Sequence, residues 1–437
     1  MIPFFSPAEQ AALVQWYEVA FATPPSALPF SFRYGDRAFA EVAPSWEASA
    51  KDTGGGRLLT FRDPATGLEV TCEVRRFDDF AAVEWVLYFR NTGEQDTPIL
   101  ADIQALDTAF ALPREQPARV HHAKGSDCGI DDFAPLVDDL NPTANAPQTG
   151  WRGAGNPLVF GTHGGRSSNG ALPFFNVELG GGRGVIGAVG WTGDWTARFW
   201  RGDGGEVHAQ AGMRRTHLKL LPGESIRSPR MLLLFWEGDR LRGHNALRRL
   251  ILAHHSPREG RELERAPISF AVWGENRAER QLGKVRWFAE HAIPIDNFWI
   301  DAGWHGDGEY KDSSNVFNSA WGAHVGNWWP NKTPYPDGLG PIGEAVRAAG
   351  MDFTLWLEVE RVFRGTQFTR EHPEWLLGPL GDNSLFNLGD PEARGALTDL
   401  VSSVIEQAGV TVYRQDFNMD PAPFWEAADA PDRVGIS

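Results

Sequence analysis

The sequence predicts a β-rich part followed by an α/β part, and three observations support this fold class. Residues 1 to about 240 contain short apolar runs separated by turns rich in glycine and proline. A helical pattern and a charged segment interrupt this organisation near residue 255. After residue 268, strand-like and helical patterns alternate, which is typical of a parallel sheet covered by helices. A chain of 437 residues is long enough for two or three domains with a large core.

The first part is expected to form a sandwich of antiparallel sheets. Several of its strands alternate apolar and polar residues, as a sheet with one wet face should. The segments R-N-T-G, G-D-G-G and L-P-G-E indicate turns between the strands. Residues 120–170 lack periodicity, so we expect long loops there. The expected strands are 69–75, 82–90, 185–191, 196–200 and 230–236.

A domain boundary is expected after residue 257. Residues 241–255 carry the pattern of a helix, and the charged segment 258–267 has the composition of a linker. We therefore expect one domain over residues 1–257 and a second over residues 268–437.

The second part should contain a parallel sheet, because its strands are almost continuously apolar. A doubly wound sheet and a barrel both fit this pattern. No glycine-rich phosphate-binding motif follows the first strand, so nucleotide binding gains no support. Strands are expected over 268–273, 297–301, 352–360 and 410–416, and helices over 276–292, 340–350 and 391–409.

Polar and aromatic side chains follow these strands at the points where the strands end. Parallel strands bring their carboxyl ends to one face, where α/β barrels keep their active sites. Carboxylates and amides bind hydroxyls, and indoles cover apolar sugar faces, so the pattern is typical of a sugar-binding site or a glycoside hydrolase. The four strand ends carry Trp273 and Glu275, then Asp301 and Trp304, then Trp356, Glu358, Glu360 and Arg361, and finally Arg414, Asp416 and Asn418.

Asp416 is the strongest candidate for a catalytic group. Val410, Val412 and Tyr413 predict a short buried strand directly before it. A carboxylate beside a core is costly unless it is paired or used. The alternative is that Asp416 merely caps the next helix, as aspartates at strand ends often do.

The composition argues against several other classes of function. A net charge of −16 disfavours nucleic acid and anionic membranes as partners, and no run of 18 apolar residues could span a bilayer. The N-terminus lacks the basic region of a signal peptide, which favours a cytoplasmic location. The 18 tryptophans fit either core packing or sugar binding.

Neither a metal nor a cofactor is expected. The two histidine pairs lack the spacing of metal ligands, and no H-E-x-x-H motif occurs. The two adjacent serines are not part of a G-x-S-x-G motif, and the two cysteines form no C-x-x-C pair. The residues concerned are His121 and His122, His254 and His255, Ser167 and Ser168, and Cys72 and Cys128.

A series of motifs in the second part resembles glycoside hydrolase family 36, the α-galactosidase (melibiase) family. In chain order they are W-I-D-A-G-W, W-W-P-N-K-T-P-Y-P-D-G-L-G-P-I, G-M-D-F-T-L-W-L-E-V-E-R-V, E-H-P-E-W-L-L, N-L-G-D-P-E-A-R and V-Y-R-Q-D-F-N. The resemblance extends into the first part through R-N-T-G, G-R-S-S with P-F-F, and G-W-T-G-D-W. It covers nearly the whole chain.

The resemblance implies a β-supersandwich followed by a (β/α)8 barrel, and a retaining reaction through a glycosyl-enzyme intermediate. It implies that Asp416 is the nucleophile. It also implies that Asp301 binds galactose hydroxyls and that Trp356 lies beneath the sugar. The complete set of substrate-binding residues expected in this way is Asp301, Trp304, Trp328, Trp356, Glu358, Arg414 and Asn418.

Three residues depart from the family pattern, and they leave the sugar open. Ala302 and Asn327 stand where the family has acids, and Arg414 stands where it has a lysine. The alternatives are therefore another α-glycosidase, such as an α-N-acetylgalactosaminidase, a transglycosylase, or a non-catalytic carbohydrate-binding protein. An α-galactoside is the expected partner, and a homo-oligomer is left open.

The resemblance also implies that the chain contains only the first half of the barrel. Four of eight strands are recognised, and the family's acid/base aspartate follows a sixth strand. We therefore expect the acid/base to be absent from these residues, and this chain alone to hydrolyse nothing measurable.

Overall fold

The computed structural model describes residues 4–22, 27–141, 152–257, 266–272, 277–307 and 321–435. The chain forms two compact units, one of residues 1–262 with 429–436 and one of residues 263–428. Most of the expected linker 258–267 lies outside the described residues, as do Trp273 and Glu275.

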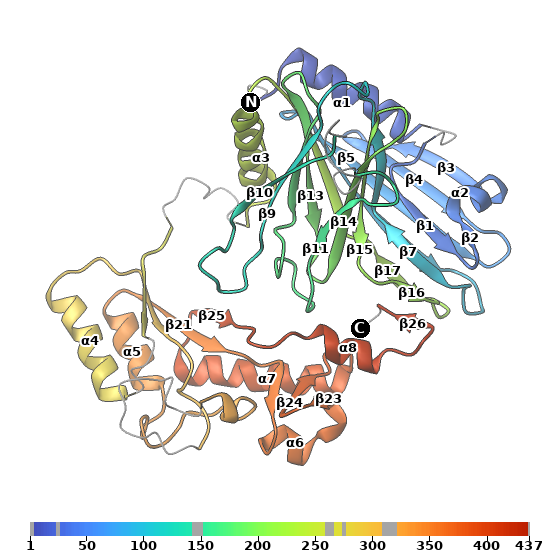
Figure 1. Ribbon diagram of the computed structural model, residues 1–437. Helices are drawn as coiled ribbons and strands as arrows, with labels where there is room; N and C mark the ends of the chain where they lie inside the picture. The colour runs from blue at the N-terminus through green and yellow to red at the C-terminus, as the bar shows by residue number, and fades with distance from the viewer. Residues whose placement is uncertain are drawn as a thin grey trace. The chain divides into compact units, whose positions relative to one another are not determined.

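The first unit consists of three antiparallel sheets (Figure 1). The largest has the order β10 (Pro135–Asp139), β9 (Arg119–Ala123), β12 (Phe174–Glu178), β13 (Arg183–Gly190), β18 (Arg230–Glu237), β6 (Ala82–Asn91), β5 (Leu68–Arg76), β4 (Gly56–Arg62) and β3 (Glu47–Asp52), with β17 (Ser225–Arg227) also paired to β6. A second sheet has the order β2 (Arg37–Ala38), β1 (Ser31–Tyr34), β7 (Leu100–Gln104), β16 (His217–Leu218) and β26 (Arg433–Val434). The third has the order β11 (Leu158–Gly161), β14 (Trp195–Arg201), β15 (Val207–Met213) and β8 (Leu106–Phe110).

The three sheets share one apolar core to which one helix contributes, and a second helix forms a separate apolar cluster on the other face of the large sheet. Helix α1 (Pro7–Ala20) begins at Ser6 with a reciprocal capping box and buries Leu13 and Tyr17 in this core. Helix α3 (Arg240–His254) covers the opposite face of β13 and β18. As a result, β18 is buried on both faces and does not show the one wet face that the sequence pattern suggested.

The expectation of loops over residues 120–170 is wrong in part. Strands β9 and β10 form a hairpin there, and β11 pairs with β14. Four of the five residues of β10 are exposed, so this strand shows no apolar alternation. Strand β9 also pairs with β12, and β11 pairs with β14, and these partners are distant in sequence, so a local pattern could not reveal them.

The second unit is built on a parallel sheet, as expected. Its order is β19 (Ser269–Val272), β20 (Asn297–Ile300), β21 (Asp352–Leu357) and β25 (Val412–Gln415). Helices α4 (Ala278–Glu290), α5 (Gly340–Ala348) and α7 (Pro391–Ala408) share an apolar core with the first three strands (Figure 1). Helix α7 begins at Asp390, which caps it, and ends at Gly409 in the left-handed conformation.

A small antiparallel sheet follows β21 and was not anticipated. It has the order β22 (Arg361–Phe363), β24 (Asn383–Phe386) and β23 (Leu376–Leu380). The remaining short elements are α2 (Phe39–Val42), α6 (Gln367–Glu371), α8 (Ala422–Ala428) and the 3-10 turns Ala43–Ser45, Trp321–His324 and Pro373–Trp375. None of the helices within the described ranges has both the length and the apolar composition needed to cross a bilayer.

Strand β25 is present where the sequence predicts it, but it is not buried. Val412 is 36% exposed and Tyr413 is 39% exposed. Among the described residues, β25 pairs with β21 alone and therefore forms an edge of the sheet. Its apolar side chains consequently lie beside one neighbouring strand, β21, and not between two.

Candidate active site

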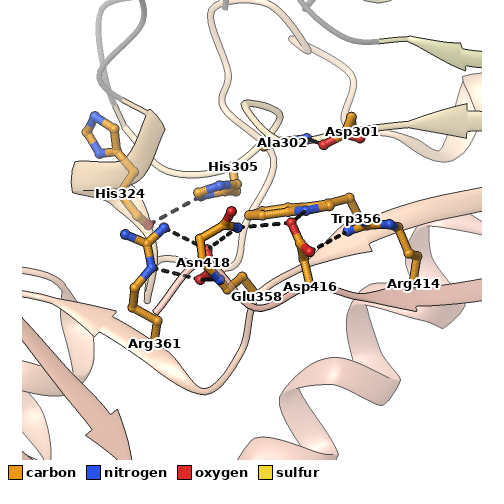
Figure 2. A network of polar contacts seen from close by, with 10 residues as sticks. All are labelled: Asp301, Ala302, His305, His324, Trp356, Glu358, Arg361, Arg414, Asp416 and Asn418. Atoms are coloured by element: carbon orange, nitrogen blue, oxygen red, sulfur yellow. Dashed lines mark hydrogen bonds and ion pairs between the residues drawn. The ribbon is translucent and has the colours of Figure 1, made fainter. Parts of the chain in front are cut away.

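Three carboxylates follow the strands of the parallel sheet directly. Asp301, Glu358 and Asp416 are the first residues after β20, β21 and β25. Ile300 lies opposite Leu355, and Leu357 lies opposite Gln415, so the carboxyl ends of these strands share one edge of the sheet. Figure 2 shows the three acids with the side chains around them.

Asp416 is held by donors from three directions. Trp356 Nε1 and Asn418 Nδ2 both donate to its Oδ2, over 2.8 and 2.9 Å. Arg414 Nη1 lies 3.2 Å from its Oδ1. The backbone N–H of Asp416 also donates to the Leu357 carbonyl over 2.8 Å, which extends the β21–β25 ladder by one residue.

The carboxyl group of Asp416 is ionised at neutral pH. Burial by itself would raise its pKa, but the hydrogen bonds from Trp356, Arg414 and Asn418 outweigh this effect and hold the pKa below its ordinary value. The group remains accessible, since the side chain of Asp416 is 27% exposed and that of Arg414 is 33% exposed. The Arg414 guanidinium also lies over the Trp299 ring, 4.9 Å from its centroid.

Asp301 has the opposite electrostatic behaviour. Burial raises its pKa, and the negative charge of Asp416 acts in the same direction. The N–H of Ala302, which donates to Oδ1 over 2.7 Å, and the positive charge of Arg414 act against this. Ala302 itself is completely buried.

Glu358 is almost inaccessible, with 2% of its surface exposed. Arg361 grips it as a fork, with Nε 2.9 Å from Oε1 and Nη2 2.6 Å from Oε2. The backbone N–H of Asn418 donates to Oε1 over 2.7 Å, and its Nδ2 donates to Oε2 over 3.2 Å. Figure 2 shows Glu358 and Asn418 between Arg361 and Asp416.

The expected tryptophans Trp304, Trp328 and Trp356 are 0%, 2% and 1% exposed and form a buried layer, so none of them presents an open ring face in this structure. Trp304 donates its indole N–H to the Trp356 carbonyl over 2.8 Å, and Trp328 packs near both rings, with centroids 6.1 Å away in each case. His305 stacks on Trp356 at 5.8 Å and 16° and is fully buried. Burial and the neighbouring His324 lower the pKa of His305 to about 3, so the ring is neutral.

The structure thus brings together all seven residues expected at the site with Asp416. It adds His305, which the sequence did not name, and Arg361, which the sequence placed at the third strand end but not among the substrate-binding residues. His305 lies in the tryptophan layer, and Arg361 pairs with Glu358. The E-V-E-R run contains Glu358 and Arg361 three residues apart, and the turn between β21 and β22 brings the two side chains together. Asn327 is occupied within the fold, since its Oδ1 accepts from the backbone N–H of Gln367 over 2.8 Å.

Comparison with known proteins identifies the relatives of this chain. Residues 244–423 match the Melibiase family model. α-Galactosidase C of Emericella nidulans is 26% identical over 247 residues, which cover 52% of this chain and 32% of that protein. α-Galactosidase Mel36A of Lactobacillus acidophilus is 22% identical over 295 residues, which cover 63% of this chain and 38% of that protein. The chain therefore spans 32% to 38% of the length of these curated relatives.

The fold is also similar to that of solved structures. The family 36 α-galactosidase AgaA of Geobacillus stearothermophilus superposes with a TM-score of 0.69 at 16% identity. The superposition covers 91% of this chain and 56% of that one, so both units take part in it. Together with the motif order along the sequence, these matches make the chain similar to glycoside hydrolase family 36, the α-galactosidase (melibiase) family, in sequence over residues 244–423 and in fold.

Proposed function

We propose that the site at the ends of β20, β21 and β25 hydrolyses terminal α-linked galactosides with retention of configuration, and that Asp416 is the nucleophile. One observation carries this proposal: an accessible, ionised carboxylate follows a parallel strand, and two N–H donors fix its orientation. A retaining glycosidase needs such a group, since its first step is the attack of a carboxylate on the anomeric carbon.

The contacts of Asp416 indicate which of its oxygens attacks. Oδ2 already accepts from Trp356 and Asn418, whereas Oδ1 is contacted by Arg414. In our proposal Oδ1 forms the bond to the anomeric carbon while the glycosidic C–O bond breaks and the leaving oxygen takes a proton from a second carboxyl group. Water then attacks the anomeric carbon and gives a proton to the second carboxyl group, now a carboxylate, while the glycosyl-enzyme bond breaks and the ionised Asp416 is restored.

The other residues of the site would bind and orient the sugar. Asp301 and Arg414 lie on either side of the tip of β21 and offer an acceptor and a set of donors to hydroxyl groups. Variants of AgaA have been crystallised in complex with raffinose and with stachyose. On that basis we propose an α-galactoside oligosaccharide as the class of substrate for the protein that contains this chain.

We further propose the finer architecture that the family resemblance implies. Residues 1–257 would form a β-supersandwich and residues 268–428 the first half of a (β/α)8 barrel, with 258–267 as the linker. Residues 429–436, which the sequence assigned to the second part, belong to the first unit, where β26 pairs with β16. The parallel order β19-β20-β21-β25 and the exposed outer edge of β25 support this proposal. The proton donor would then come from a later strand of the barrel, because the two oxygens of Glu358 are occupied by Arg361 and Asn418.

A mechanism-based label tests the role of Asp416 without requiring that proton donor. Fluoride leaves without general acid assistance, so 5-fluoro-α-D-galactosyl fluoride should form a covalent adduct with the purified chain. Proteolysis and mass spectrometry should place the adduct on Asp416, and Asp416→Asn should abolish it. A label on another carboxylate would overturn the assignment. Binding of galactose without any label would favour the alternative, a non-catalytic carbohydrate-binding protein.

A further inference from the structure

We propose that Glu358 is a positioning residue, which holds Asn418 so that the Asn418 amide donates to Asp416. This inference rests on the proposed function, and it assigns Glu358 a different role from the substrate contact that the family resemblance implies. The geometry of Glu358, of Asn418 and of the charges around Asp416 supports it.

The hydrogen-bonding capacity of Glu358 is used up inside the protein. A carboxylate offers two acceptor positions on each oxygen. Oε1 accepts from Arg361 Nε and from the backbone N–H of Asn418, and Oε2 accepts from Arg361 Nη2 and from Asn418 Nδ2. The residue is also 2% exposed, so a sugar hydroxyl could reach it only by displacing one of these donors.

The side chain of Asn418 transmits this anchoring to the nucleophile. Its Nδ2 carries two hydrogens, and two acceptors lie within reach, Oε2 of Glu358 at 3.2 Å and Oδ2 of Asp416 at 2.9 Å. Because both neighbours are acceptors, the nitrogen and not the oxygen of the amide must face them. Glu358 therefore fixes both the position of Asn418, through its backbone N–H, and the orientation of its amide.

Arg361 offsets the free-energy cost of burying the Glu358 carboxylate. A lone carboxylate at the position of Glu358 would be costly to bury and would repel Asp416. The guanidinium of Arg361 binds both oxygens of Glu358, and the backbone of Arg361 is held by the pairing of β22 with β24, where Arg361 lies opposite Leu385. The charged groups that bear on Asp416 are thus Arg414 directly, Asp301 from β20, and the Glu358–Arg361 pair from the end of β21.

The variant Glu358→Gln distinguishes positioning from a simple charge effect, because the two roles change the pKa of Asp416 in opposite directions. If Glu358 acted only through its charge, its removal would lower the pKa of Asp416, because a nearby negative charge disappears. If it acts through Asn418, an amide N–H replaces an acceptor, the Asn418 amide turns away, and the pKa of Asp416 rises. We expect a rise of about one pH unit and labelling by the galactosyl fluoride slowed about tenfold.

The pKa of Asp416 can be measured by NMR with 13C-labelled aspartate, using Asp416→Asn to assign the signal. Asn418→Ala should raise this pKa as much as Glu358→Gln does, and the double variant should add nothing further. Arg361→Lys keeps the charge but loses the planar fork, so it should raise the pKa of Asp416 by less. This variant replaces Glu358→Gln in the test if Glu358→Gln does not fold. The matched control is Glu360→Gln, since Glu360 bonds Gln415 and makes no contact with Asp416 among the described hydrogen bonds.

Two results would overturn the positioning role. One is a fall in the pKa of Asp416 in Glu358→Gln. The other is weaker binding of galactose in Glu358→Gln that adds to the effect of Asn418→Ala, because this would place Glu358 in contact with the sugar. Failure of the wild-type chain to be labelled at Asp416 would instead contradict the proposed function. The NMR titration does not depend on labelling, so it tests the positioning role of Glu358 separately.

Discussion

Trp356 donates its indole N–H to Oδ2 of Asp416 over 2.8 Å, although the two residues lie 60 positions apart in the chain. Trp356 lies near the end of β21, opposite Arg414 in the β21–β25 register, and Asp416 is the first residue after β25. The bond therefore links the end of one strand to the residue that follows the neighbouring strand. Trp356, which the family resemblance implies to lie beneath the sugar, is 1% exposed in this structure and acts as a donor to the proposed nucleophile.

Trp356→Phe should keep the apolar ring and remove this donor. We expect the pKa of Asp416 to rise and labelling by the galactosyl fluoride to slow about tenfold, because a hydrogen bond to a charged group is lost. Labelling rates across a pH series would measure both effects. Trp287→Phe, at a half-exposed position on α4, is the matched control and should leave the rate unchanged.

The two aspartates should affect the stability of the fold in opposite directions. The pKa of Asp416 is lowered in the folded state, so its contribution is present above its unfolded pKa and is lost as the pH falls through the folded pKa. The pKa of Asp301 is raised, so ionisation destabilises the fold as the pH rises from its unfolded pKa through its folded pKa. At neutral pH, Asp416→Asn should lower the free energy of unfolding and Asp301→Asn should raise it.

Urea denaturation at neutral pH and near pH 3 would check both signs. Near pH 3 the gain in Asp301→Asn should disappear, because Asp301 is protonated there in both the folded and the unfolded state, whereas the loss in Asp416→Asn should persist until the pH falls through the lowered pKa of Asp416. Equal losses of stability for the two variants at neutral pH would contradict the electrostatic account of the site.

Asp301→Ala should remove roughly 2–4 kcal/mol of transition-state stabilisation, because it breaks hydrogen bonds between a carboxylate and the sugar. The quantity to measure is kcat/KM for an activated α-galactoside, with the full-length protein as the enzyme. An unchanged kcat/KM would place Asp301 outside the sugar-binding site. A loss of activity in a more stable variant would show that the site keeps Asp301 for function at a cost in stability.

Arg414→Lys would introduce the residue that the family pattern has at this position. The ammonium should lose the stacking on Trp299 and the planar contact with Asp416, because lysine is a point donor on a flexible stem. We expect labelling by the galactosyl fluoride to slow severalfold, with a smaller change for Trp299→Phe, which keeps a ring beneath the guanidinium. Faster labelling in Arg414→Lys would indicate that Arg414 serves a different sugar, and α-N-acetylgalactosaminide substrates would be the first to compare.

The sequence predicts the parallel sheet and the carboxylates at its strand ends because both depend on local patterns. An apolar run followed by a polar residue identifies a strand and its end, and parallel pairing then places Asp301, Glu358 and Asp416 on one edge. What the sequence misses depends on contacts between distant segments. The pairing of β22 with β24 positions Arg361, and the edge location of β25 leaves Tyr413 exposed.

The role of Glu358 was hardest to anticipate, because a carboxylate at a strand end fits either a ligand contact or an internal anchor. Only the four donors around it distinguish these possibilities, and they come from β22 and from the segment after β25.

The hydrogen bond from the Asp416 backbone N–H to the Leu357 carbonyl has a consequence for the behaviour of the site on heating. The ladder between β21 and β25 continues to Asp416 itself, so its Cα is fixed by the sheet and only the short side chain can rotate. Strand β25 is nevertheless an exposed edge strand, and segments with few buried contacts open before the larger cooperative unit to which they belong. The nucleophile should therefore lose its position when β25 detaches from β21, and thermal inactivation should precede loss of the rest of the parallel sheet.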